Sequence, residues 1–139
     1  MRNITTLLLA LAMLVSCSKK NDPAAEPELN GTYNIDALVN LDGETLQFPT
    51  SDPGLVITSV IEVTLPTKNR IDLMRKGTAG GTSYLDYLGQ YEIKKNTSAD
   101  YDVLLDSKII GVIGSNNLYL DFQGKSKNSN IVSITGKKK

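Results

Sequence analysis

The sequence contains no histidine and no tryptophan, and Cys17 is its only cysteine. With one cysteine the chain cannot form an internal disulfide, although exported proteins are free to use them. Without histidine, and with a single thiol, it also lacks the parts of the common nucleophile–base pairs and of the commonest zinc sites. We therefore expect a core that holds together by packing alone, no enzymatic activity, and no metal or other cofactor.

An excess of charge of one sign is missing as well. The 139 residues carry 15 Lys and Arg against 15 Asp and Glu, and the two signs are interspersed. Because nucleic-acid-binding domains typically show a basic patch or stripe, we expect no nucleic acid partner. The last three residues, Lys137 to Lys139, are typical of a frayed, solubilising end of the chain.

One continuous apolar run stands at the start of the chain. Arg2 precedes the uncharged segment 4–15, which is shorter than the about 20 apolar residues of a membrane-spanning helix. Its length matches the apolar region of a secretory signal peptide. The segment leads into Leu14-Val15-Ser16-Cys17, so a small residue directly precedes the thiol. We expect residues 1–16 to be a cleaved export signal.

The ending of this segment resembles the lipobox of bacterial lipoproteins. That resemblance implies lipidation of the Cys17 thiol and a cell-envelope protein anchored by lipid, which we place in the outer membrane. Two or more acyl chains anchor stably, since each buried methylene contributes about 0.8 kcal/mol. Residues 18–22 are similar to the charged export tags of some surface-displayed lipoproteins, so the periplasmic and cell-surface faces both stay open. An ordinary signal peptide followed by a chance cysteine is the alternative.

The remaining chain divides into a tether and one domain. Residues 18–28 contain two prolines and five charges and offer little to bury, which is typical of a solvated tether. We therefore assign the lipidated cysteine and its flexible tether to residues 17–29. Residues 30–136 have the usual size of one domain, and 137–139 form a basic tail.

From residue 29 onward the apolar residues alternate with period two, and turn residues recur every eight to twelve positions. No segment predicts a helix. Residues 77–81 are rich in glycine and are expected to open a flexible loop. Residues 49–54 are expected to form a loop because Pro49 and Pro53 cannot donate a hydrogen bond to a neighbouring strand. The predicted strands are 31–39, 44–48, 55–65, 70–76, 84–95, 101–106, 108–113, 118–123 and 130–135.

The alternation also predicts which side chains share a face. Gly89 lies in the middle of the inward face of the 84–95 strand, which indicates a bend, a bulge or the close approach of another strand. On that face we expect Leu85, Tyr87, Tyr91 and Ile93. On the first strand the corresponding residues are Tyr33, Ile35, Ala37 and Val39.

Eight or nine short antiparallel strands fit either a closed up-and-down barrel or a two-sheet β-sandwich. Sequential hairpins, the lack of a long crossover and Gly89 at the centre of the longest strand favour the barrel, whose sheet must coil to close. An immunoglobulin-type sandwich is disfavoured, because the chain has no tryptophan and no cysteine pair. The predicted fold is all-β, a single antiparallel barrel, with the sandwich as the alternative.

Two short segments resemble the lipocalins. Residues 29–33 (LNGTY) resemble the first strand of lipocalin-like lipoproteins, with Tyr33 where the family has tryptophan, and residues 99–101 are similar to a second lipocalin motif. The resemblance implies a barrel that binds a small apolar ligand at its open mouth. The residues that would line it are Tyr87, Tyr91, Tyr101 and Phe122. Inward aromatic residues in a barrel of this size also serve simply to fill the core.

Two further functions stay open. A non-catalytic surface interaction, as an accessory subunit of an envelope complex, requires a solid core and an exposed apolar patch. Catalysis or calcium binding would have to use Asp100, Asp102 and Asp106, which recur at even spacing. Because Asp102 and Asp106 alternate with apolar residues, we interpret them as the solvated side of a strand.

Overall fold

The computed structural model describes residues 28–52, 55–123 and 130–139, so residues 1–27, with the signal segment and Cys17, lie outside the described residues. The described residues form ten strands and no helix. The strands are β1 (Gly31–Asn40), β2 (Thr45–Gln47), β3 (Thr50–Asp52), β4 (Leu55–Thr67), β5 (Arg70–Ala79), β6 (Thr82–Lys95), β7 (Tyr101–Leu105), β8 (Lys108–Ile113), β9 (Asn117–Asp121) and β10 (Ile131–Lys138). In this part of the chain no helix has the length and apolar character needed to cross a bilayer.

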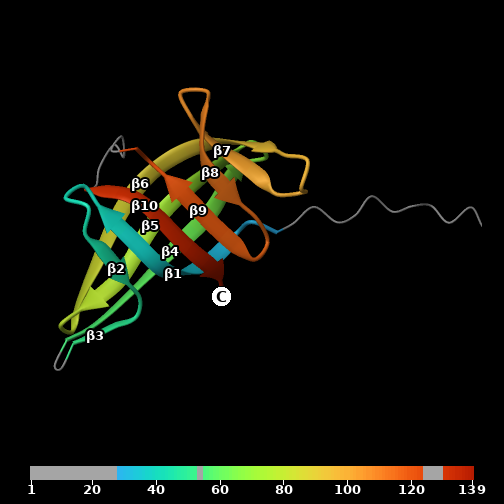
Figure 1. The fold of residues 1–139 in the computed structure, drawn as a ribbon. Coiled ribbons are helices and arrows are strands. Elements are labelled where there is room, and N and C mark those ends of the chain that lie inside the picture. Colours follow the sequence, from blue (N-terminus) through green and yellow to red (C-terminus); the bar gives the residue numbers. More distant parts are fainter. Residues whose placement is uncertain (1–27, 53–54, 124–129) are drawn as a thin grey trace, which may run out of the picture.

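Eight strands, β1 and β4 to β10, form a closed antiparallel barrel (Figure 1). Each strand from β4 to β9 pairs with the next one in sequence, and β10 pairs with β1. The ring closes where Gly31 to Asn34 of β1 pair with Val63 to Val60 of β4. The prediction of a single up-and-down barrel is therefore confirmed, and the sandwich alternative is wrong.

The short strands β2 and β3 lie outside this ring. β2 pairs with Ala37 to Val39 of β1, and β3 pairs with Leu55 to Ile57 of β4. The pairing of β1 with β4 ends at Asn34 and Val60, and beyond that point the two strands part. We call this divergence the seam. Residues 50–52 were predicted to be loop. They form strand β3 because they pair with the backbone of β4 where β4 no longer pairs with β1.

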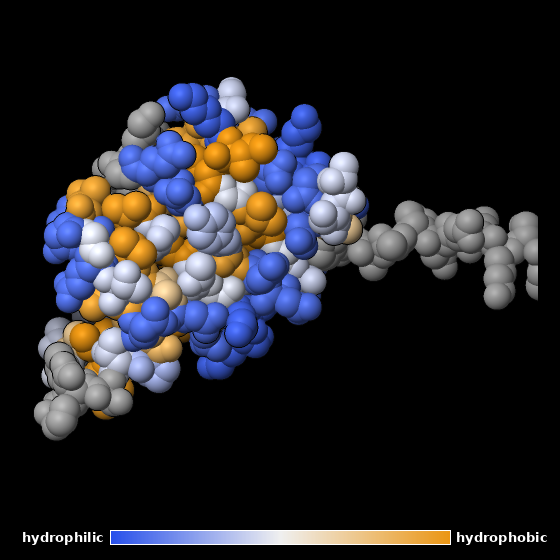
Figure 2. Space-filling model, in the orientation of Figure 1, coloured by the Kyte–Doolittle hydropathy of each residue, from blue (hydrophilic) through white to orange (hydrophobic). Residues whose placement is uncertain are grey.

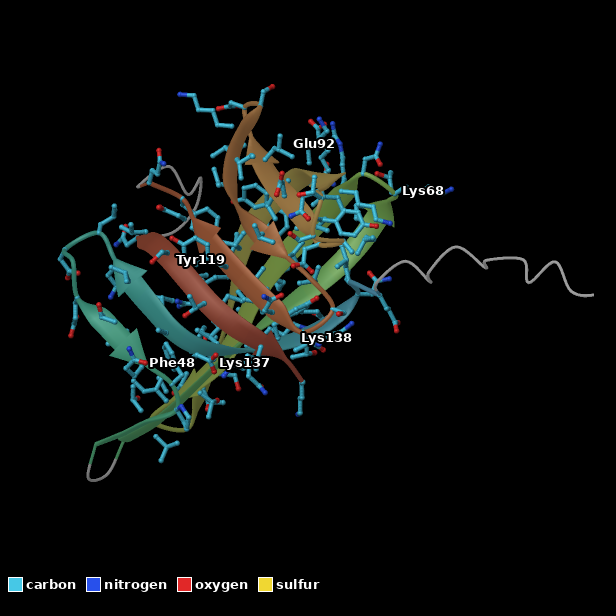
Figure 3. The ribbon with its side chains drawn as sticks, turned by 45° about the vertical axis from the view of Figure 1, so that its right-hand side comes forward. Phe48, Lys68, Glu92, Tyr119, Lys137 and Lys138 are labelled. Atoms are coloured by element: carbon cyan, nitrogen blue, oxygen red, sulfur yellow. The ribbon has the colours of Figure 1, made fainter. Side chains whose placement is uncertain are left out.

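The barrel has a tether end and a far end. The tether end carries the start of β1, the connections 68–69, 96–100 and 114–116, and the end of β10. The far end carries the connections 41–44, 80–81 and 106–107. There the tips of β4, β5 and β6 project together with β3 (Figure 1). Lys68 and Phe48 lie toward opposite ends of the molecule (Figure 3).

Apolar side chains fill the interior of the barrel. The largest fully buried side chains include those of Tyr33, Phe122, Leu38, Ile61, Ile71, Leu73 and Leu88. Hydrophobic side chains also reach the surface, where they are interspersed with hydrophilic ones on the face seen in Figure 2.

Register shifts alter the predicted alternation in β1. Ile35 pairs with Gly136 and Ala37 pairs with Thr135, so Asp36 is an extra residue on β1, as in a β-bulge. The bulge brings Leu38 into the core at 1 % exposure. Ala37 and Val39, which were predicted to face inward, are instead half-buried.

Strand β5 continues through most of the predicted glycine-rich loop. It ends at Ala79, so only Gly80 and Gly81 form the turn. Opposite Gly77, Tyr84 lies across the glycine and its hydroxyl donates to the Thr58 carbonyl oxygen at 3.1 Å. An aromatic side chain that covers a glycine in a paired strand restores the packing that the glycine lacks.

The basic residues at the end of the chain belong to the barrel. β10 runs to Lys138, and the backbone nitrogen of Lys139 donates to the Thr32 carbonyl oxygen at 2.8 Å. The predicted boundary at 136, with a frayed tail beyond it, is therefore wrong. Pairing with β1 and β9 holds these residues in place, which a lysine run does not reveal in sequence.

Candidate functional site

The tether end of the barrel is closed by Tyr33. Its hydroxyl lies 2.9 Å from the Gly114 carbonyl oxygen and 3.1 Å from that of Leu29, so its single proton is shared between two acceptors, the nearer being Gly114. Leu29 is itself buried. Burial raises the pKa of Tyr33 to about 12. The Lys138 ammonium lies 5.9 Å from the centre of the Tyr33 ring. Because these contacts close the tether end, an open mouth of the barrel is expected at the far end.

Two of the four predicted ligand-lining residues meet in the interior. The ring centres of Tyr91 and Phe122 are 5.9 Å apart, and both side chains are buried. The Tyr91 hydroxyl donates to the Leu88 carbonyl oxygen at 2.8 Å, and burial is the main cause that raises the Tyr91 pKa to about 12. Gly89 has φ of +128° beside this ring and lies next to a register shift of β6, so of the three predicted alternatives the bulge is the one observed.

Tyr87 lies on the outside of the barrel, so its predicted place on the inward face is wrong. Leu73 pairs with Gly89 whereas Met74 pairs with Tyr87, which makes Leu88 an extra residue on β6. This bulge reverses the alternation, so Tyr87 is 44 % exposed and Leu85 is 61 % exposed. The Tyr87 hydroxyl donates to Asp72 Oδ1 at 3.1 Å on the outer face.

Tyr101 lies at the tether end, away from Phe122. It is half-buried and borders a polar depression of about 310 Å³ together with Lys68, Glu92 and Lys94. The structure therefore brings together only two of the four predicted residues. Their role in ligand binding stays a prediction.

A pocket of about 270 Å³ opens at the far end, next to Phe122. Leu105, Ile109 and Ile110 supply the rest of its apolar lining, and Asp106, Lys108 and Gln123 supply polar groups. Ile110 is buried because a further bulge, between the Val103–Gly111 and Leu104–Ile109 pairs, places it inside. Of these residues the sequence indicated only Phe122 as a ligand contact. We call this the far-end pocket.

The interior faces of β5 and β6 become polar toward the far end. Arg75 and Asp86 form an ion pair of 2.8 Å, with side chains 19 % and 40 % exposed. The Arg75 guanidinium also lies 4.8 Å from the centre of the Tyr84 ring. Alternation from the buried Ile71 and Leu73 places Arg75 on the inward side, and the bulge at Leu88, which the alternation did not reveal, turns Asp86 to the same side.

The seam forms a slit of about 370 Å³. Side chains that face outward, such as Asn34 and Val60, line it together with Ile35 and Ser59, which face inward. Phe48 borders the slit and packs partly against the core. The slit reaches inward-facing residues because the hydrogen bonding between β1 and β4 stops at this level.

A shallow groove of about 470 Å³ lies on the outer face of β4, β5 and β6. Leu85, Val60 and Lys76 border it, and the Thr58 and Thr78 hydroxyls hydrogen-bond to each other at 2.9 Å beside it. Together with the exposed Val56, these residues give this face an apolar character.

The three aspartates considered for metal binding or catalysis do not converge. Asp100 lies against Gly114 at the tether end, and Asp102 accepts a hydrogen bond from the Asn96 side chain at 3.0 Å. Asp106 lies in the turn at the far end. Among residues 28–52, 55–123 and 130–139, no three His, Cys, Asp or Glu side chains gather to hold a metal ion.

Comparison with protein-family models, with curated proteins and with solved structures finds no match for this chain. The eight-stranded closed antiparallel barrel is compatible with a lipocalin-like fold. Any function must therefore be argued from the site itself, since one fold hosts many activities.

Proposed function

We propose that this chain is a lipid-anchored lipoprotein of the cell envelope whose barrel binds a small apolar ligand in the far-end pocket. The observation that carries the ligand proposal is the apolar lining by Leu105, Ile110 and Phe122 beside polar groups at one end of a closed barrel. Ligand sites typically combine such a lining with a few polar groups and enclose about 300–1,000 Å³. A pocket of about 270 Å³ favours a ligand smaller than a typical drug molecule.

The position of the pocket supports the anchored arrangement. The lipid proposed at Cys17 would be joined to β1 through the segment that enters the barrel at the tether end. The far-end pocket lies at the other end of the strands, so a barrel held at its tether end presents that pocket to the solution. We propose binding without catalysis, since the pocket pairs Asp106 and Lys108 with no histidine or thiol.

Ligand binding can be tested by fluorine NMR with para-fluoroethylbenzene, a small apolar probe. Full-length protein in detergent micelles should broaden the probe signal in a saturable way relative to empty micelles. Leu105→Trp should abolish this binding because the larger ring fills the pocket. Leu85→Trp, which places the same ring on the outer face, should leave it intact. No saturable binding, or equal binding by both variants, contradicts the proposal.

Lipidation is tested separately by incorporation of labelled palmitate in cells. The wild-type chain should take up the label and lose its first sixteen residues. Cys17→Ala should do neither. A wild-type product that carries no label contradicts the anchor while leaving the ligand proposal open.

The outer groove favours a second candidate function, that of an accessory subunit in an envelope complex. Val56 and Leu85 are 59 % and 61 % exposed on neighbouring parts of the β4–β6 face. Exposed apolar patches often mark protein interfaces. This function predicts a stoichiometric partner that is recovered with the detergent-solubilised wild-type protein and lost with Leu85→Glu, whereas Leu105→Trp keeps it.

A further inference from the structure

Three buried side-chain atoms in the described part of the chain lack a hydrogen-bond partner, and all three surround one stretch of β4. They are Thr50 Oγ1, Ser59 Oγ and Arg75 Nε. Thr50 pairs with Ile57, Arg75 pairs with Ile61, and Ser59 lies between these two positions on the same inward face. Buried polar groups are normally hydrogen-bonded, so the unpaired Ser59 hydroxyl, which is 4 % exposed, is free to bond to a ligand.

The chemistry of these groups limits what that partner is. Arginine Nε is only a donor, and both hydroxyls donate as well. The charge of Arg75 is already balanced by Asp86 at 2.8 Å. A further carboxylate or phosphate would bury a negative charge without a counter-charge, which is costly. An uncharged acceptor oxygen, such as that of a ketone, ester, amide or alcohol, satisfies the donors without this cost.

The seam slit gives such a group a way in. Ser59 lines the slit and is only 4 % exposed. The apolar part of the lining around it consists of Ile35, Phe48, Pro49 and Val60, and the polar part consists of Asn34, Asp36 and Thr58. The slit encloses about 370 Å³, within the usual size of a ligand site.

We propose that the seam between β1 and β4 binds a small uncharged molecule with an apolar body and an acceptor oxygen that Ser59 Oγ contacts. The site uses β1, β4 and the residues that follow β2, so it is separate from the far-end pocket and does not depend on the function proposed above.

The test uses fluorine NMR of full-length protein with para-fluoroacetophenone, an aryl ketone. Para-fluorobenzoate is the charged comparison, and para-fluoroethylbenzene lacks the oxygen. The ketone should bind in a saturable way, and Leu105→Trp should not prevent it. Ser59→Ala should weaken ketone binding by roughly fivefold to tenfold, the worth of about one hydrogen bond. Ser83→Ala, on the exposed turn side of β6, should change nothing.

Two further measurements keep the proposal open to refutation. Ser59→Ala should unfold in urea at the same or a slightly higher concentration, because it removes an unpaired hydroxyl. Asn34→Trp, at an exposed position lining the slit, should abolish ketone binding. The proposal is overturned if Ser59→Ala binds the ketone like the wild type, if Asn34→Trp does not affect binding, or if the benzoate or ethylbenzene binds there as tightly as the ketone.

Discussion

Among single residues, Tyr33 makes a buried polar contact between segments that are far apart in sequence. Its buried hydroxyl donates across the tether end to the Gly114 carbonyl oxygen at 2.9 Å. Tyr33→Phe leaves that carbonyl without this partner, which should destabilise the protein by about 1–3 kcal/mol in urea unfolding. Tyr119→Phe, at an exposed position on β9, is the control and should have little effect. Equal stability of the two variants would show that the contact is unimportant.

Alkaline pH should act through the same residue and through Tyr91. Burial raises the pKa of each to about 12, above the usual value of 10.0. Because the folded state holds these protons more tightly, their contribution is complete below pH 10 and is lost as pH rises toward 12. Tyr33→Phe and Tyr91→Phe should each flatten this loss in unfolding experiments between pH 9 and pH 12. An unchanged pH profile in both variants argues against buried, protonated rings.

A substitution of Tyr87 tests whether this part of β6 turns its tyrosine side chain outward, as the structure has it. It lies on the outer face, where its hydroxyl bonds to Asp72. Tyr87→Ala should therefore change stability by only about 0.5 kcal/mol, as is usual for surface positions. It should leave the binding of para-fluoroethylbenzene unchanged. Loss of probe binding in this variant would mean that the predicted inward face was right after all.

At the scale of strands, the sequence revealed where elements lie better than which way they face. The alternation predicted nine strands close to their observed positions, and residues 108–113 matched β8. Bulges at Asp36, Leu88 and Ile110 are single extra residues in otherwise alternating runs, and only Gly89 signalled one of them. Each bulge reverses the alternation beyond it, which explains why Ala37, Val39 and Tyr87 were misplaced.

Near the tip of the β5–β6 hairpin, Gly77 lies in a space too small for any side chain. A Cβ at Gly77 would lie 2.1 Å from the Thr58 carbonyl oxygen and 2.3 Å from the Tyr84 hydroxyl. Gly77→Ala should therefore cost about 2 kcal/mol or more by forcing the backbone and ring apart.

Gly43→Ala is the matched control for that variant. Nothing lies within 4 Å of its added methyl group, so only its φ of +84° opposes the change. A cost of roughly 1 kcal/mol is expected from this conformation. If both variants unfold at the same denaturant concentration, the close approach at Gly77 is not what holds the hairpin.

For the whole molecule, closure of the barrel depends on β10. This strand pairs with β1 on one side and β9 on the other. Deleting residues 131–139 should leave two open edges and an exposed core, and should abolish cooperative thermal unfolding. Deleting Lys139 alone removes one backbone hydrogen bond and should leave unfolding cooperative. Cooperative unfolding of the longer deletion would contradict a single closed ring.

The candidate sites were less predictable than the fold. Phe122 could be predicted to face inward because it continues the regular alternation of Leu118 and Leu120. Leu105 and Ile110 line the same pocket, and Ile110 does so because of the bulge in β8, which the sequence did not reveal. The seam depends on where β1 leaves β4, and the segment beside it contains Pro49 and was interpreted as loop. Pairing between strands distant in sequence creates both sites, and no local pattern encodes it.

The central claim is that a closed barrel with a filled interior binds a small apolar molecule at its far end. An amide NMR titration of the full-length protein with para-fluoroethylbenzene tests it most directly. The largest shift changes should fall on Leu105, Ile110 and Gln123, with Gly31 and Gly114 at the tether end unaffected. Shifts centred on the tether end, or no shifts at saturating probe, would contradict the claim.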